Sequence, residues 1–225
     1  MSAVRAWPRY PWWVDDTEWI THPVDFHLSY KGPLPKSDDR HARVEAKQRI
    51  RACINTQLWQ LTELDKRFRT EIDRAVLAEM RGSRLIPKEE SPGFMVVHVG
   101  GYWFLPLVDR RRSLVCYLNI KFLRRGSVGQ IVHGGDLDNR IKTLCDALRI
   151  PQHANEVPAG IKAPLGPTML CLLEDDALIV KLLIDTGMLL DPLVEGESAT
   201  DVRLEMDVSI RPGPGTGADH WLGQP

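Results

Sequence analysis

The stretch from Ser113 to Arg149 changes its apolar spacing once, and this change constrains the fold more than any other feature of the chain. From Ser113 to Leu123 every second residue is apolar, which is the pattern of a half-buried β-strand. From about Asn139 to Arg149 apolar residues recur at intervals of three and four, as on a helix with one buried face. A Gly-rich loop, 124–135, joins the two segments. The chain therefore contains both β-strand and α-helix, and the loop carries it from one to the other.

The residues expected to point inward from these two elements are all apolar. On the strand they are Leu114, Cys116, Leu118, Ile120 and Phe122, and on the helix they are Ile141, Leu144, Cys145 and Leu148. Further strands are expected at Val24–Tyr30, Phe94–Leu107, 177–186 and 202–211. Further helices are expected from a cap at Ser37, Asp38 or Asp39 to about Leu64, and from Asp65 to Met80. The segments 81–93 and 150–168 are expected to be loops, the second because it holds four prolines.

The length of 225 residues fits one large domain, and the sequence contains no internal repeat. We expect this domain to cover 24–211, with an insertion around 60–110. Residues 1–23 are rich in Trp and Pro and are expected to form an irregular arm that packs its own aromatic rings. Packing of the arm against the domain or a second subunit is the alternative. The Gly- and Pro-rich tail, 212–225, is expected to be flexible.

Composition excludes several classes of protein. A net charge of −1 means that any nucleic-acid surface must be a local patch of Lys and Arg. The four cysteines lie far apart with no Cys-x-x-Cys spacing, so we expect reduced thiols and neither zinc nor a disulfide framework. The chain has no run of about 18 apolar residues, and Met1–Tyr10 lacks the features of a signal peptide. We therefore expect a cytoplasmic protein that does not bind a membrane.

Two acidic segments carry the most informative chemistry. Asp136 and Asp138 precede the helix, Lys142 lies one turn into it, and Glu174-Asp175-Asp176 follows further along the chain. In an extended lead-in, Asp136 and Asp138 would point the same way, and Asp138 occupies the place of a helix N-cap. Carboxylates from separate segments are suitable ligands for Mg²⁺, which prefers oxygen and also binds substrate phosphate. The pattern therefore indicates a magnesium site that acts on phosphodiesters.

Each of these features alone has an ordinary structural explanation. Asp138 is often only a helix cap, and Lys142 with Asp146 is often a surface pair four residues apart. The run Glu174-Asp175-Asp176 can be a simple acidic turn. A loop histidine such as His133 usually has no role. Only their joint occurrence in this order favours a metal site.

Basic residues gather around the first acidic segment. Between Asp109 and Arg149 the chain holds nine Lys and Arg against four Asp, which is an excess of positive charge that suits a phosphate backbone. The candidate nucleic-acid contacts are Arg110, Arg111, Arg112, Lys121, Arg124, Arg125 and Arg140. The run Arg110-Arg111-Arg112 is equally compatible with a solvated hairpin.

The run Asp136-Leu137-Asp138-Asn139, with Lys142 and then Asp146-Ala147-Leu148, resembles the RusA-type Holliday junction resolvases. In that family these residues precede a later Asp-Asp, which corresponds here to Asp175-Asp176. The resemblance implies an α+β fold, a mixed β-sheet flanked by helices, with N-terminal and loop extensions in this chain. It also implies that Asp136, Asp138 and Asp176 bind the metal, with Asp175 as a further candidate, and that Lys142 assists catalysis.

The same resemblance implies a function and its partners. We expect a homodimeric endodeoxyribonuclease that uses Mg²⁺, or Mn²⁺ in its place, to cleave Holliday junctions or other branched DNA in recombination and repair. Two alternatives stay open. One is a nuclease of the same fold that acts on other DNA or on RNA within a larger complex, and the other is a non-catalytic nucleic-acid-binding module.

Overall fold

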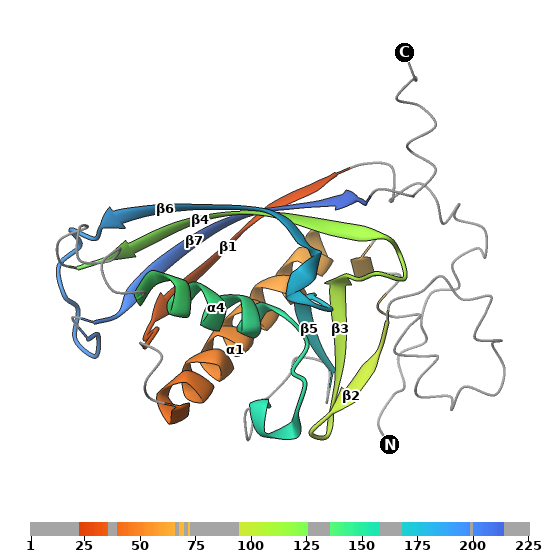
Figure 1. Ribbon diagram of the computed structural model, residues 1–225, viewed down its shortest axis with the longest axis horizontal. Coiled ribbons are helices and arrows are strands. Elements are labelled where there is room, and N and C mark those ends of the chain that lie inside the picture. Colours follow the sequence, from red (N-terminus) through yellow and green to blue (C-terminus); the bar gives the residue numbers. More distant parts are fainter. Residues whose placement is uncertain are drawn as a thin grey trace, which may run out of the picture.

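Two mixed β-sheets and two long helices make up the part of the chain that a computed structural model describes, namely residues 23–35, 40–65, 68–69, 72, 95–125, 136–157, 168–198 and 200–213 (Figure 1). The helices are α1 (Arg40–Leu64) and α4 (Asp136–Leu148), with short 3-10 turns η1 (Ala154–Glu156) and η2 (Asp176–Leu178). The strands are β1 (Val24–Gly32), β2 (Val97–Val99), β3 (Tyr102–Val108), β4 (Leu114–Arg124), β5 (Thr168–Leu173), β6 (Ile179–Met188) and β7 (Val202–Pro212). The expected α+β class, with mixed sheet and flanking helices, is confirmed.

The larger sheet has the strand order β1-β7-β4-β6. Strand β7 runs antiparallel to β1 and β4, whereas β4 and β6 are parallel. Both helices lie on the same side of this sheet (Figure 1). The alternation predicted for β4 is confirmed, because Leu118, Ile120 and Phe122 are buried while the residues between them are only half-buried or exposed.

The two helices pack against each other beneath the larger sheet, and α1 also contacts β1 and β5. Helix α1 contains no Gly or Pro, and its apolar residues Ala46, Ile50, Ile54 and Leu58 recur every four positions on one buried stripe. Each such fully buried aliphatic side chain larger than alanine stabilises the fold by roughly 1.5–3 kcal/mol. The four inward positions predicted for α4 are likewise buried.

The smaller sheet, with the order β2-β3-β5, differs from the sequence prediction in two ways. The single strand expected at Phe94–Leu107 is a hairpin, because Gly100 and Gly101 both take positive φ values (59° and 85°) that suit a two-residue turn. Strand β5 is absent from the sequence prediction, which places a loop at 150–168 and the next strand at 177–186. Its six residues are all buried, so the strand shows no alternation by which periodicity could reveal it.

Parts of the segment 60–110, where an insertion is predicted, contribute to the hydrophobic core. Leu105, Leu107 and Val108 of β3 are fully buried in the main hydrophobic cluster. Of the helix expected at 65–80, the structure describes Asp65, which is not helical, and Phe68, Arg69 and Ile72, which are. Phe68 and Ile72 are fully buried. The predicted arm (except Pro23), the loop 81–93, the residue His133 and most of the predicted tail lie outside the described residues. No helix in the described segments is long and apolar enough to cross a membrane.

The chain passes from the smaller sheet to the larger one at a turn that contains a buried ion pair. Asp109 is fully buried and accepts hydrogen bonds from the backbone N–H of Arg112 (2.8 Å) and from its Nε (2.6 Å). The Arg112 guanidinium also donates to the carbonyl oxygens of Pro106 (2.9 Å) and Leu107 (3.0 Å). Buried charges are tolerated only when paired and hydrogen-bonded in this way.

The substitution Arg112→Met tests the importance of this turn. It leaves the Asp109 carboxylate buried without its partner, so we expect the free energy of unfolding in urea to fall by about 3–5 kcal/mol. Arg111→Met, a change at the neighbouring exposed residue, is the matched control and should change that free energy by less than about 0.5 kcal/mol. Equal losses in the two variants would contradict this account of the turn.

Candidate functional site

The first acidic segment lies on the first turn of α4, which begins at Asp136 and not near Asn139 as predicted. The expectation of an extended lead-in is therefore wrong. Residues two apart on a helix are rotated by about 200°, so positions 136 and 138 do not share one face. The structure describes the backbone of Asp136 and not its side chain. Asp138 instead shares a face with Lys142, one turn further along.

Asp138 and Lys142 are both exposed, and no hydrogen bond or ion pair joins either side chain to another residue in the described part of the chain. The alternative pairing of Lys142 with Asp146 is not observed. Asp146 is instead bonded to Lys47 of α1 (3.2 Å) and to Arg149 (3.1 Å). The exposed face of α4 therefore presents one carboxylate and one ammonium group that serve no visible structural purpose.

Buried polar contacts from α1 fix the position of α4. The Arg51 guanidinium is 3% exposed and donates to the carbonyl oxygens of Asp146 (2.7 Å) and Glu156 (2.7 Å). Burial lowers the pKa of Arg51, and the nearby Glu156 carboxylate acts in the opposite direction. Together with the Lys47–Asp146 pair, these contacts hold the C-terminal half of α4 against α1. The face that carries Asp138 and Lys142 is thereby left open.

The second acidic segment connects β5 to β6 and is tied to the Asp109–Arg112 turn. The backbone N–H of Glu174 donates to Val108 (2.9 Å), and its carboxylate accepts from the backbone N–H of Arg110 (2.8 Å). Asp175 accepts from the Arg110 guanidinium (3.0 Å) and from the N–H of Ala177 (2.9 Å). The bond from Ala177, more than the charge of Arg110, lowers the pKa of Asp175. Of the three acids, Asp176 is the exposed one, and a side-chain hydrogen bond joins it to Asp175, where it also lowers the pKa of that carboxyl.

The second acidic segment lies against α4, because η2 contacts that helix. Burial raises the pKa of the Cys145 thiol to about 11, and the negative charge of Asp176 is the next largest cause. Asp176 therefore lies close enough to Cys145 to act on it electrostatically. Cys145 follows Asp138 by seven residues, about 10 Å along the helix axis, and Lys142 lies between them. The order along this side of α4 is thus Asp138, Lys142 and then the neighbouring Asp176.

These groups do not form a closed metal cage in the described structure. Among the side chains that it describes, no three His, Cys, Asp or Glu residues lie close enough to hold one metal ion. The Asp136 side chain lies outside that set. The assignments of Asp136, Asp138, Asp175 and Asp176 as ligands remain predictions.

The predicted basic patch is smaller in the structure than in the sequence. Arg112 and Arg140 are buried, and Arg140 donates to the carbonyl oxygen of Leu34. Arg125 is bonded to Glu197 (3.0 Å) and to the carbonyl oxygens of Asp191 and Pro192. These three arginines support the fold in ways that sequence spacing does not reveal. Of the other four, Arg110, Arg111 and Lys121 are exposed and Arg124 is half-buried.

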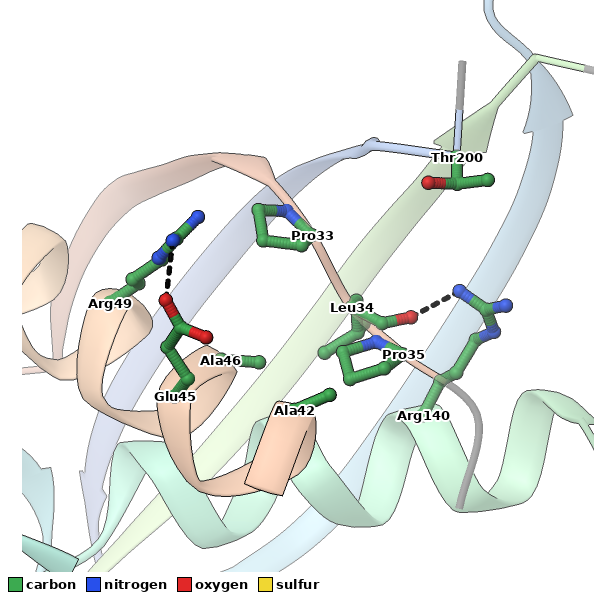
Figure 2. Close-up of a pocket in the computed structure, with 9 residues that line it drawn as sticks. All are labelled: Pro33, Leu34, Pro35, Ala42, Glu45, Ala46, Arg49, Arg140 and Thr200. Atoms are coloured by element: carbon green, nitrogen blue, oxygen red, sulfur yellow. Dashed lines mark hydrogen bonds and ion pairs between the residues drawn. The ribbon is translucent and has the colours of Figure 1, made fainter. Parts of the chain in front are cut away.

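A cavity of about 530 Å³ lies beside the first half of α4, and sequence analysis gave no indication of it. Its walls come from the exit of β1, the start of α1, Arg140 and Thr200 (Figure 2). Figure 2 shows that its two guanidinium groups already have partners, since Arg49 is bonded to Glu45 (2.6 Å) and Arg140 to Leu34. The cavity therefore offers mainly an apolar wall, and Arg140, its one lining residue from α4, lies about 200° around the helix from both Asp138 and Lys142.

Comparison with known proteins gives no family for this chain. No protein-family model matches it, and neither does any curated protein or solved structure. The resemblance to RusA-type resolvases therefore depends on the residues of the two acidic segments alone.

The substitution Asp176→Asn tests whether η2 lies against α4. Removing the negative charge should lower the pKa of Cys145 from about 11, because the thiolate is then less disfavoured. An NMR titration of the chain labelled with ¹³C at the cysteine β-carbons measures this value, with Cys145→Ser to assign the signal. Asp185→Asn, at an exposed carboxylate of β6, is the control and should leave it unchanged. An unchanged Cys145 pKa in Asp176→Asn would contradict the contact.

Proposed function

We propose that this chain is a RusA-like, metal-dependent endodeoxyribonuclease that cleaves Holliday junctions or other branched DNA. The observation that supports the proposal best is the contact between η2 and α4. It puts η2, which contains Asp176, against the helix that carries the unpaired Asp138 and Lys142, although these residues are more than thirty positions apart in the chain. Asp138 and Lys142 are exposed acidic and basic groups with no partner in the described part of the chain, and such groups are available to bind a charged ligand.

The available donors fit Mg²⁺ or Mn²⁺, because exposed carboxylates are hard oxygen ligands. Asp138 and Asp176 would hold the metal, and the resemblance adds Asp136. Asp175 is less suited, since both of its oxygens already accept hydrogen bonds. A bound divalent ion supplies an activated water and neutralises charge on the phosphate that is attacked. Mg²⁺ commonly uses only one or two carboxylates together with substrate phosphate, so a preformed three-carboxylate cage is not required.

The side chains of the protein then have separate roles. Asp138 lies in the first turn of α4, where the positive end of the helix dipole favours a negative charge. Lys142 places its ammonium group next to the reacting phosphate and stabilises the negative charge that develops there. Arg111 and Lys121 are exposed and would contact the DNA backbone away from the reaction.

The proposed biological setting is DNA recombination and repair, with the chain acting as a homodimer. Two symmetry-related sites suit a four-way junction, in which two strands of like polarity must be cut. The proposed substrate distinguishes this function from a nuclease for other DNA or RNA. The proposed metal chemistry distinguishes it from a module that binds nucleic acid without cutting it.

Strand cleavage of a labelled four-way junction, in Mg²⁺, in Mn²⁺ and in EDTA, tests the proposal. We expect paired, metal-dependent nicks in the junction and not in linear duplex of the same sequence. Lys142→Met should lower kcat by about 10²–10³-fold, because it removes one group that stabilises the transition state. Asp138→Asn and Asp176→Asn should lower it at least as much.

The matched control is Asp25→Asn, which changes an exposed carboxylate of β1 between the buried Val24 and the half-buried Phe26. Its kcat should stay within about twofold of the unchanged chain. If duplex DNA or RNA were cleaved at the same rate as the junction, branched DNA would not be the specific substrate. Binding of the junction with no cleavage in either metal would contradict the enzyme assignment.

A further inference from the structure

Strand β6 forms one edge of the larger sheet, next to β4 (Figure 1). In the part of the chain that the structure describes, no other strand pairs with its outer side. Ten residues of strand thus present a free row of backbone N–H and C=O groups. Natural sheets usually protect such an edge with charges, proline, a bulge or a covering element, because it is a template for pairing with another chain.

Strand β6 exposes apolar side chains and has few of the charged residues that normally protect an edge strand. Val180, Leu182, Leu183 and Met188 are 55%, 41%, 49% and 49% exposed. The apolar surface continues directly after the strand with Leu190, Leu193 and Val194, which are at least as exposed as the strand residues. β6 itself has only two charged residues, Lys181 and Asp185. An exposed apolar region of this extent is typical of an interaction surface.

Two copies of β6 paired antiparallel would place complementary side chains opposite each other. In an antiparallel pairing with Leu183 at its centre, Lys181 of one copy lies opposite the partner's Asp185, and the same pair recurs on the other side of the axis. Leu182 then lies opposite the partner's Ile184, and Val180 opposite the partner's Thr186. Odd-numbered residues meet odd-numbered ones, so each face of one sheet continues into the same face of the other. Opposite charges and apolar pairs directly across a strand pair both stabilise it.

We propose that two copies of this chain pair through β6, antiparallel and centred on Leu183, to form one continuous eight-stranded sheet. The self-complementary charges favour a second copy over an unrelated peptide, because a single register satisfies all four charged groups. The exposed residues after the strand enlarge the surface toward the roughly 1,200–2,000 Å² of a stable interface. The proposal depends on the edge alone and holds whether or not the chain cleaves DNA.

The pairing has a geometric consequence for the candidate site. Because like faces join, α1 and α4 of both copies lie on the same side of the common sheet. Position 176 precedes the central Leu183 by seven residues, so the two copies of η2 are separated by about 45 Å along the strand direction. If the proposed nuclease function is correct, both sites therefore face the same side of the dimer.

Disulfide trapping of the full-length chain tests the register. In the proposed dimer the two copies of residue 183 have Cα atoms about 4.5–5.5 Å apart, a distance that a disulfide can span. Leu183→Cys should therefore crosslink under mild oxidation and be released by reductant. Val180→Cys is the matched control on the same strand, because its two copies would be about 20 Å apart. Crosslinking of Val180→Cys as efficient as that of Leu183→Cys would overturn the proposal.

Charge exchange provides a second test that introduces no cysteine. In sedimentation equilibrium, Lys181→Asp or Asp185→Lys should each raise the Kd of the dimer about five- to thirtyfold, because two attractive pairs become repulsive. The double variant restores opposite charges and should bring the Kd back to within about threefold of the starting value. No restoration in the double variant, or a monomer at 100 µM unchanged chain, would overturn the proposal. Neither experiment requires metal or DNA, so failure of the nuclease assignment cannot be mistaken for failure of the dimer.

Discussion

The buried ion pair between Asp109 and Arg112 holds the two sheets of this protein in their relative positions. The chain crosses from the smaller sheet to the larger one twice, once from β3 to β4 and once through η2 from β5 to β6. Strands β3 and β5 are parallel, as are β4 and β6, so the two crossings lie side by side. The first crossing is fixed by Asp109 and Arg112, and Arg110 then binds Glu174 and Asp175 of the second. The position of η2 therefore depends on a turn more than sixty residues earlier in the chain.

Polar contacts inside the core fix the positions of the two helices in a similar way. Arg51 and Asn55 of α1 are buried, and they bond to the end of α4 and to the backbone N–H of Leu170 in β5 (2.8 Å). These bonds specify how α1 sits between α4 and the smaller sheet, which apolar burial alone does not specify. Helix α4 is thus held by Arg140 in its first half and by the Asp146 contacts in its second half, while its side with Asp138 and Lys142 stays exposed. The candidate site combines that open side with an acidic turn whose other two carboxylates are already bonded.

The sequence predicted those parts of the fold in which one face is buried and the other is not. Alternation located β4, and spacing by three and four located the buried face of α4, because both elements are amphipathic. It could not locate β5, whose residues are buried on both faces, and it did not recognise Gly100-Gly101 as a hairpin turn. Burial of Arg112 and Arg140 also escaped prediction, since the carbonyl oxygens that receive their hydrogen bonds are defined only by the tertiary structure. For the candidate site, the motif predicts Asp136, Asp138, Lys142 and Asp176, whereas the helical start of α4 and the bonds that engage Glu174 and Asp175 are visible only in the tertiary structure.

The central claim is that α4 and η2 together bind a divalent cation, and paramagnetic broadening by Mn²⁺ tests it most directly. Backbone amide signals of the ¹⁵N-labelled chain would be recorded during a titration with Mn²⁺ in the absence of DNA. We expect selective broadening of the signals from 136–142 and 174–178, and loss of this broadening when Asp138 is replaced by Asn. Uniform weak broadening, or selective broadening at another part of the chain, would contradict it.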